Sequence, residues 1–206
     1  MHVSSVSSKP ARRTQAERRA RTRAALLEAA AKGFSRYGYG NVVLEQVANE
    51  AGYTRGALYH QFAGKEELAL AVVEWVAESW EREVWQPAQR NAQPVEVLVA
   101  LARGHIAYCR RDIARVMMSL RVEFAGREHP VGRTVDAIGK DLGRRFGTLI
   151  NAGRRNGSIP PGPSARTLAV AVVAAMEGLA IQMAGVRDDE LIAERMVRGM
   201  LGLDVT

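Results

Sequence analysis

Residues that build disulfides, metal centres and covalent active sites are scarce in this chain of 206 residues. Its one cysteine is Cys109, and its four histidines are scattered at positions 2, 60, 105 and 129. A single cysteine excludes an internal disulfide framework and a cysteine-rich zinc site, and we expect Cys109 to be a buried, small apolar residue. The HExxH, GxSxG, P-loop and dinucleotide-binding patterns are also missing. We therefore expect no enzyme, no metal site and no cofactor.

Long apolar runs and strand patterns are absent too. The first twenty residues contain no apolar core like that of a signal peptide. The most apolar run, 168–183, is interrupted by Glu177, Gly178 and Gln182 and is short for a bilayer span. Alternating strand patterns are nearly missing, so the sequence predicts an all-α, cytoplasmic protein with no membrane partner.

The stretch Leu44–Gln61, LEQVANEAGYTRGALYHQ, has the pattern of two short helices joined by a tight turn. Apolar residues at spacing i, i+3, i+4 and i+7 from Leu44 give the first helix a buried face. Gly52 lies where a chain leaving a helix often takes positive φ, and Thr54 is placed to cap a second helix that carries Leu58 inward. Such a hairpin is typical of the helix-turn-helix unit, whose second helix enters the major groove of DNA.

Residues on the outer face of that second helix suit contact with DNA. Arg55 can pair with guanine or hold a phosphate, Gly56 permits close approach, and Tyr59 and His60 can reach phosphate oxygens. The alternative is an ordinary helical hairpin with a solvated face.

Positive charge is concentrated at the N-terminus. Residues 1–23 contain seven lysines and arginines against Glu17 alone, whereas the whole chain has a net charge of +7. A cationic arm beside a groove-reading helix attracts phosphates whatever the base sequence. The alternative is a solubilising tail. We expect residues 1–15 to form a disordered basic arm.

These features resemble the tetracycline-repressor (TetR) family of transcriptional regulators. The resemblance runs from AALLEAAAKGFSRYG at 24–38 through VANEAGYTRGALYHQF at 47–62 to GKEEL at 64–68, and beyond that only the general layout matches. One departure is at Val42 and Val43, where the family usually has a threonine or serine that caps the first motif helix and often touches phosphate. Asn41 would be the cap if that helix began earlier.

Lys65 is the last expected DNA contact. It opens the next helix, where a cation opposes the helix dipole and suits a nearby phosphate, and the resemblance implies the same contact. The alternative is a solvated surface lysine. The expected DNA-binding residues are Arg19, Arg21, Arg23, Thr54, Arg55, Gly56, Ala57, Tyr59, His60 and Lys65.

Periodicity and helix breakers divide the chain into about nine helices. We expect them at about 16–37, 44–51, 55–61, 65–86, 95–110, 112–125, 131–155, 164–184 and 188–202. Residues 16–64 would form a three-helix DNA-binding domain. Residues 65–206 would form a helical body for effector binding and dimerisation.

The body has apolar stripes with methionines and aromatics, which suit a ligand pocket, although each such residue can equally be plain core. The resemblance implies a pocket here. Burying His105 or Tyr108 requires a partner, which a ligand or a neighbouring side chain would supply. Trp80 is expected to point away from the inward face that carries Trp75. The apolar lining favours a hydrophobic or aromatic effector, whereas the arginines within 110–121 would accept a carboxylate or phosphate compound such as an acyl thioester. The expected ligand-binding residues are Trp75, Leu101, His105, Tyr108, Met117, Phe124 and Met176.

Residues 168–183 are apolar on nearly every side, which is typical of a helix buried against both its own core and a partner. With helix 188–202 they predict a four-helix interface between two copies, as the resemblance also implies. The alternative is a helix central to a monomer. The expected dimerisation residues are Leu168, Val172, Met176, Leu179, Met183, Ile192, Met196 and Met200.

The sequence thus predicts a homodimeric repressor with recognition helices about 34 Å apart on a palindromic operator. A small molecule in the body would weaken DNA binding through helix 65–86, to the extent that it prefers a different spacing of the heads. The rival is a DNA-binding architectural protein with no effector and a solid body. A continuous cavity near His105, Tyr108 and Met117 would discriminate between them.

Overall fold

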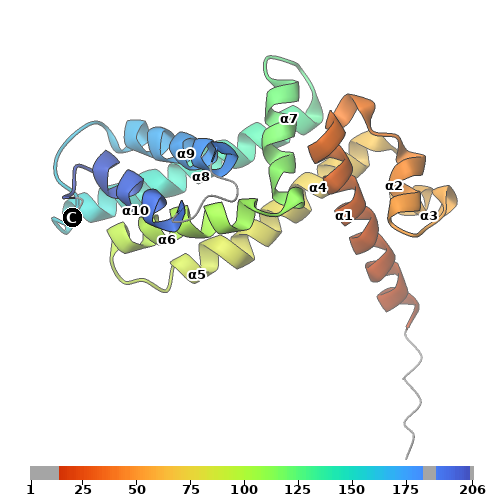
Figure 1. The fold of residues 1–206 in the computed structure, drawn as a ribbon, viewed down its shortest axis with the longest axis horizontal. Coiled ribbons are helices and arrows are strands. Elements are labelled where there is room, and N and C mark those ends of the chain that lie inside the picture. Colours follow the sequence, from red (N-terminus) through yellow and green to blue (C-terminus); the bar gives the residue numbers. More distant parts are fainter. Residues whose placement is uncertain (1–13, 183–188, 205–206) are drawn as a thin grey trace, which may run out of the picture.

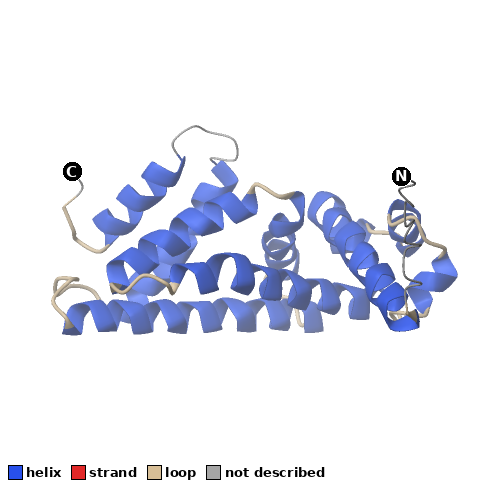
Figure 2. Cartoon of the chain, turned by 90° about the horizontal axis from the view of Figure 1, so that it is seen from below, coloured by secondary structure: helices blue, strands red, loops and turns tan. Residues whose placement is uncertain are grey.

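The computed structural model describes residues 14–182 and 189–204, and this part of the chain is helical with no strand. Figures 1 and 2 show an elongated arrangement with α2 and α3 at one end. The helices are α1 Gln15–Asn41, α2 Leu44–Glu50, α3 Arg55–Tyr59, α4 Lys65–Trp80, α5 Gln86–Ala88, α6 Pro94–Cys109, α7 Val116–Phe124, α8 Pro130–Arg155, α9 Ala165–Gln182 and α10 Asp189–Met200. The predicted all-α fold is confirmed.

The first three helices form the head. α1 begins with a capping box in which Thr14 Oγ1 accepts from Glu17 N at 3.2 Å and Glu17 Oε2 accepts from Thr14 N at 2.9 Å. Leu26 and Phe34 of α1 are buried in one core with Leu58 of α3. The predicted 1–15 arm lies almost wholly outside the described residues.

α4 leads from the head into the body, but its end differs from the predicted helix 65–86. After Trp80 the chain forms a π-helical turn, Glu81–Trp85, and then α5. Pro87 has no N–H to donate to the Glu83 carbonyl, so the regular hydrogen-bond ladder cannot continue through this point. Glu81, the first residue of this turn, and Trp80 before it both line the body cavity described below.

The body consists of α4, α6, α8, α9 and α10, and α7 lies between it and α1 (Figure 1). A short 3-10 turn, Asp112–Arg115, joins α6 to α7. α6 packs against α10, and α8 packs against α9. α7 contacts both α1 and α8, so it connects the head with the body.

The inner face of α9 corrects part of the predicted dimer surface. Leu168, Val172 and Met176 are buried in the subunit's own core, with Met176 only 1% exposed. Of the other residues predicted there, Leu179, Ile192 and Met196 are half-buried, Met200 is exposed, and Met183 lies outside the described residues. The exposed apolar side chains of α9 are instead Val170 and Ile181. A helix that is apolar all round gives no periodicity from which to choose the face.

Candidate DNA-binding surface and effector cavity

The turn between α2 and α3 has the predicted local geometry. Gly52 adopts φ 76°, a conformation that carries no steric penalty for glycine. Thr54 Oγ1 accepts from Ala57 N at 3.2 Å and so caps α3. Leu58 is fully buried and fixes which side of α3 faces outward. These three predictions are confirmed.

The outer face of α3 is free of intramolecular ion pairs among the described residues. Arg55, Gly56, Tyr59 and His60 are exposed, and Ala57 is half-buried. The Arg55 guanidinium lies 5.4 Å from the centre of the Tyr59 ring, so both side chains occupy one patch. A cation over an aromatic face, with no carboxylate partner, can turn toward a phosphate or a guanine edge. Base and phosphate contacts by these residues stay predictions.

The predicted α1 contacts flank the same end of the molecule. Arg19 and Arg21 are exposed, whereas Arg23 is half-buried with its guanidinium 4.6 Å from the centre of the Phe62 ring. Phe62 lies three residues after the end of α3, so this contact joins Arg23 of α1 to the segment that follows α3. Its charge is thereby held close to α3.

The N-terminus of α2 has no side-chain cap. Val43 occupies the N-cap position and is 50% exposed, while Val42 is buried. The interpretation of Asn41 as a substitute cap is wrong, because α2 begins only at Leu44 and Asn41 Nδ2 donates to Tyr37 O at 3.0 Å. The first N–H groups of α2 are therefore left to solvent or to another acceptor.

Lys65 has partners within the chain. Its Nζ donates to Tyr39 O at 3.0 Å and to Gly40 O at 3.1 Å, and lies 5.3 Å from the centre of the Tyr39 ring. The solvated-lysine alternative is therefore excluded, since the ammonium group binds the carbonyls that end α1. The predicted phosphate contact by Lys65 remains untested.

A cavity of about 480 Å³ lies in the body among α4, α6, α7 and α8. This volume is within the range of small-molecule sites. Apolar side chains such as Val76, Ile138 and Leu142 make much of the lining. His105, Tyr108 and Met117, all predicted to bind a ligand, line it as well.

Four residues predicted to line the pocket lie outside this lining. Leu101 and Met176 are buried in the core, and Trp75 packs against that core. Phe124 stacks on His129 with ring centres 4.2 Å apart, near the head. Helical periodicity placed all four on inward faces, but an inward face can meet a neighbouring helix as readily as a cavity.

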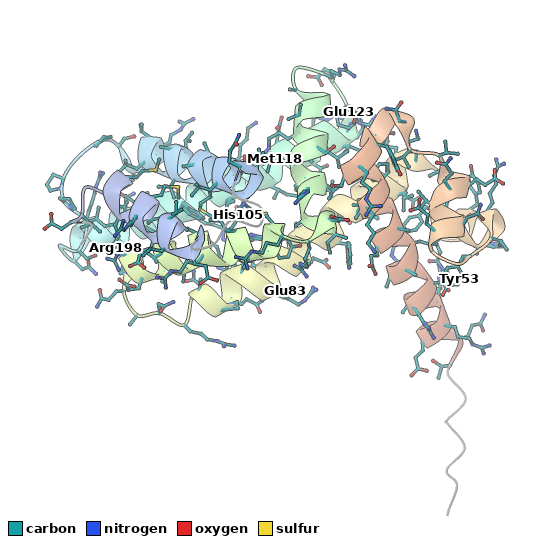
Figure 3. The ribbon with its side chains drawn as sticks, in the orientation of Figure 1. Tyr53, Glu83, His105, Met118, Glu123 and Arg198 are labelled. Atoms are coloured by element: carbon teal, nitrogen blue, oxygen red, sulfur yellow. The ribbon has the colours of Figure 1, made fainter. Side chains whose placement is uncertain are left out.

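His105 is the cavity residue with the most defined chemistry (Figure 3). Its Nδ1 accepts from Trp80 Nε1 at 3.2 Å, which assigns the proton of the neutral ring to Nε2. Burial, aided by Arg121, lowers the pKa of His105 to about 4. At neutral pH His105 is therefore an uncharged hydrogen-bond donor, and its Nε2 has only Cys109 Sγ nearby at 3.5 Å.

The Tyr108 hydroxyl already has hydrogen-bond partners within the chain, and Cys109 is an unreactive thiol. The Tyr108 hydroxyl donates to Val76 O at 3.1 Å and lies 3.0 Å from Ser79 Oγ. Cys109 is buried, as predicted, and burial raises the pKa of Cys109 to about 12. Neither group requires a ligand to complete its hydrogen bonding.

The charged side chains of the lining occur in pairs. Arg145 binds both carboxylate oxygens of Glu81, at 2.8 and 3.0 Å, and its guanidinium lies 3.4 Å from the centre of the Trp85 ring. Arg121 forms an ion pair with Glu177. Sequence patterns missed Trp80 and the Glu81–Arg145 pair, because these residues meet only through the packing of α4 and its extension against α6 and α8.

The head carries a recognisable sequence pattern as well as this geometry. The model of the family described as bacterial regulatory proteins, tetR family, matches residues 26–72, which include α2 and α3. This chain carries the DNA-binding domain of the TetR family. It is therefore a DNA-binding transcriptional regulator.

Relatives of this TetR regulator are themselves regulators. The transcriptional repressor BepR of Brucella suis is 28% identical over 172 residues, which cover 81% of this chain and 82% of that protein. The A-factor receptor protein of Streptomyces griseus is 28% identical over 160 residues, which cover 75% of this chain and 52% of that protein. The chain thus spans about half the length of this second relative. No relative named here is an enzyme.

Solved structures show the same fold as this TetR regulator. AibR in complex with isovaleryl coenzyme A and operator DNA has a TM-score of 0.71 at 24% identity, covering 89% of this chain and 100% of that chain. A TetR regulator from Chloroflexus aurantiacus has a TM-score of 0.75 at 22% identity, covering 90% and 95% of the two chains. At these identities the likeness establishes the architecture, not the ligand.

Proposed function

We propose that this protein is a homodimeric repressor that binds a palindromic operator through α3 and is released by a small molecule in the body cavity. The observation that carries the proposal is the presence, in one chain, of an exposed Arg55–His60 surface and a separate cavity of about 480 Å³. A purely architectural DNA-binding protein has no need for such a cavity, because a solid body would be more stable.

Dimerisation is supported by the outer face of α9. Val170 is 61% exposed and Ile181 is 59% exposed, and the half-buried Val173 lies on the same side. α9 is the one described helix long and apolar enough to cross a membrane, yet it carries Glu177 paired with Arg121 and packs against α8. A second copy of α9 would cover this apolar face, and exposed apolar patches commonly mark such interfaces. The two-fold axis would pair the two α3 helices on a palindrome.

The paired charges of the cavity favour an uncharged effector. Arg121 and Arg145 are the arginines of the lining, and each already binds a carboxylate, so a ligand acid would have to break an ion pair. His105 Nε2–H is an uncharged donor of the lining, and it suits a carbonyl or ether oxygen on an apolar molecule. AibR was solved with an acyl-coenzyme A. Here the ion pairs argue against an anionic group inside the cavity.

DNA binding is tested with the promoter fragment upstream of the protein's own gene. Arg55→Ala should weaken binding by about 1 to 3 kcal/mol and relax the preference at one base of each half-site. Arg90→Ala, which removes the same charge from an exposed site in the body, is the matched control. A wild-type protein that binds this fragment no better than random DNA would refute the proposal.

Effector chemistry is tested with a fragment library divided into uncharged, anionic and cationic compounds of matched size. Thermal-shift hits should be concentrated in the uncharged set, should release the promoter fragment, and should be lost in Met117→Trp, which fills the cavity. Hits confined to anions would show that an arginine leaves its carboxylate partner for the ligand. Hits that persist in Met117→Trp would place the effector elsewhere.

A further inference from the structure

The backbone that ends α1 is held by side chains from two other helices. At Gly38, three residues before α1 ends at Asn41, the chain leaves helical geometry, with φ 76° and ψ 167°. From α7, Glu123 Oε2 accepts from Tyr39 N at 2.5 Å and Glu123 Oε1 accepts from Gly40 N at 2.8 Å. From α4, Lys65 donates to the carbonyls of the same two residues.

This arrangement satisfies four backbone groups with two charged side chains. An irregular bend at a helix end leaves N–H and C=O groups without helical partners. A carboxylate bound to two backbone N–H groups is a charge-assisted interaction, stronger than a neutral hydrogen bond. Glu123 therefore makes a charge-assisted link between α7 and the bend.

The fit around Glu123 is close. A Cβ atom added to Gly38 would lie 2.8 Å from Glu123 Oε2, so only glycine combines this φ with the approach of the carboxylate. Next to it, Tyr39 packs edge-on against Phe124 with ring centres 5.1 Å apart. One turn earlier on α7, Ser119 Oγ donates to Phe34 O at 3.1 Å. α7 thus contacts α1 through a row of specific bonds, and Figure 3 shows Glu123 at the junction of the two helices.

We infer that Glu123 is a positioning residue for DNA binding: by fixing the peptides of Tyr39 and Gly40, it sets the orientation of the α2–α3 hairpin on the body. The inference rests on the proposed binding of an operator by α3. α2 begins at Leu44, so few residues separate the fixed peptides from the hairpin.

The same helix forms part of the cavity wall. Met117 and Arg121 of α7 line the cavity, and Glu123 follows two residues after Arg121. A ligand that displaces α7 would therefore pull directly on the bend at Tyr39 and Gly40. This route is separate from α4, which carries Lys65 to the carbonyl side of the same peptides.

The test uses the full chain with Glu123→Ala, Glu123→Gln and, as the matched control, Glu128→Ala. Glu128 is exposed and lies in the loop after α7. Glu123→Ala should weaken operator binding about tenfold, a usual size for coupling between distant sites. Glu123→Gln keeps one acceptor and should lie between wild type and Glu123→Ala, whereas Glu128→Ala should match wild type.

Two readouts separate positioning from a DNA contact or a loss of fold. The dependence of affinity on salt should keep its slope, because no phosphate contact is removed. Amide exchange at Tyr39 and Gly40 should accelerate in Glu123→Ala while the amides of α8 keep their protection. If Glu123→Ala fails to fold, the same two readouts are taken from Glu123→Gln.

The outcomes are distinct. Wild-type affinity in Glu123→Ala, or unchanged exchange at Tyr39 and Gly40, overturns the role of Glu123 and leaves the proposed function intact. A shallower salt slope also overturns it, since Glu123 would then be acting on phosphate contacts. A wild-type protein that ignores its operator refutes the proposed function instead.

Discussion

The neutral state of His105 makes the stability of the protein sensitive to mild acid. In the folded protein the pKa of His105 is about 4, against 6.5 for an unperturbed histidine. Between these pH values His105 is protonated in the unfolded chain but neutral in the folded protein, so the free energy of unfolding falls as the pH falls. Above about pH 6.5 His105 is neutral in both states, and its titration does not lower the free energy of unfolding. Below that pH the free energy of unfolding falls by about 1.4 kcal/mol for each pH unit, and the total loss reaches about 3 kcal/mol near pH 4.

The groups around His105 cannot stabilise its protonated form in the folded protein. Arg121 faces it from α7 and repels the imidazolium form. Trp80 from α4 offers only a donor, which a protonated Nδ1 could no longer accept. Cys109 stays a neutral thiol throughout this range, since burial raises its pKa to about 12. The carboxylates of the lining, Glu81, Asp141 and Glu177, are bound to arginines.

The assay is chemical denaturation of wild type and His105→Gln between about pH 7.5 and pH 4, at one protein concentration. Glutamine can still accept from the Trp80 indole but does not titrate. Other acid-sensitive groups, such as Asp112, whose pKa is lowered by Arg36, are common to both proteins and cancel in the difference. The stability difference between wild type and variant should be constant above pH 6.5 and should move by about 3 kcal/mol in favour of the variant toward pH 4. Parallel curves over the whole range would refute the assignment of a buried, neutral His105.

Two single substitutions test the contact of Lys65 with the end of α1 and the apolar face of α9. Lys65→Met removes the donor to the Tyr39 and Gly40 carbonyls and should lower the free energy of unfolding by about 1 to 2 kcal/mol; unchanged stability with a lower salt slope of operator binding would make Lys65 a phosphate contact alone. Val170→Asp should convert the proposed dimer to a monomer in sedimentation velocity, whereas Val122→Asp, at a site 75% exposed on α7, should leave it intact. Equal effects of the two substitutions would remove α9 from the proposed interface.

The local features of the head could be predicted because neighbours in the sequence determine them. Gly52 needs positive φ, Thr54 caps the helix that follows it, and Leu58 faces the core through the period of α3. Each depends on residues within one or two turns. Cys109 could be predicted to be buried for a different reason, because a lone thiol behaves as a small apolar group.

The contacts of Glu123 and Lys65 with the end of α1, and the lining of the cavity, depend on residues far apart in the chain. Glu123 meets Tyr39 across 84 positions, and Arg145 meets Glu81 across 64, so no local pattern marks either pair. Lys65 illustrates the same limit, since its position at a helix start suggested an external phosphate but did not reveal the α1 carbonyls to which it donates. Three of the predicted dimerisation residues, Leu168, Val172 and Met176, lie on the buried side of α9, because hydrophobicity alone does not distinguish its two faces.

The reactivity of Cys109 can report when the structure around this buried thiol opens. With a pKa of about 12, its thiolate fraction near neutral pH is on the order of one part in 100,000, so peroxides and alkylating reagents will find almost no nucleophile. Cys109 is therefore poorly suited to reaction with oxidants. Labelling with maleimide would be slow while the thiol stays buried, and an increase in its rate would report greater exposure of Cys109 without any engineered probe.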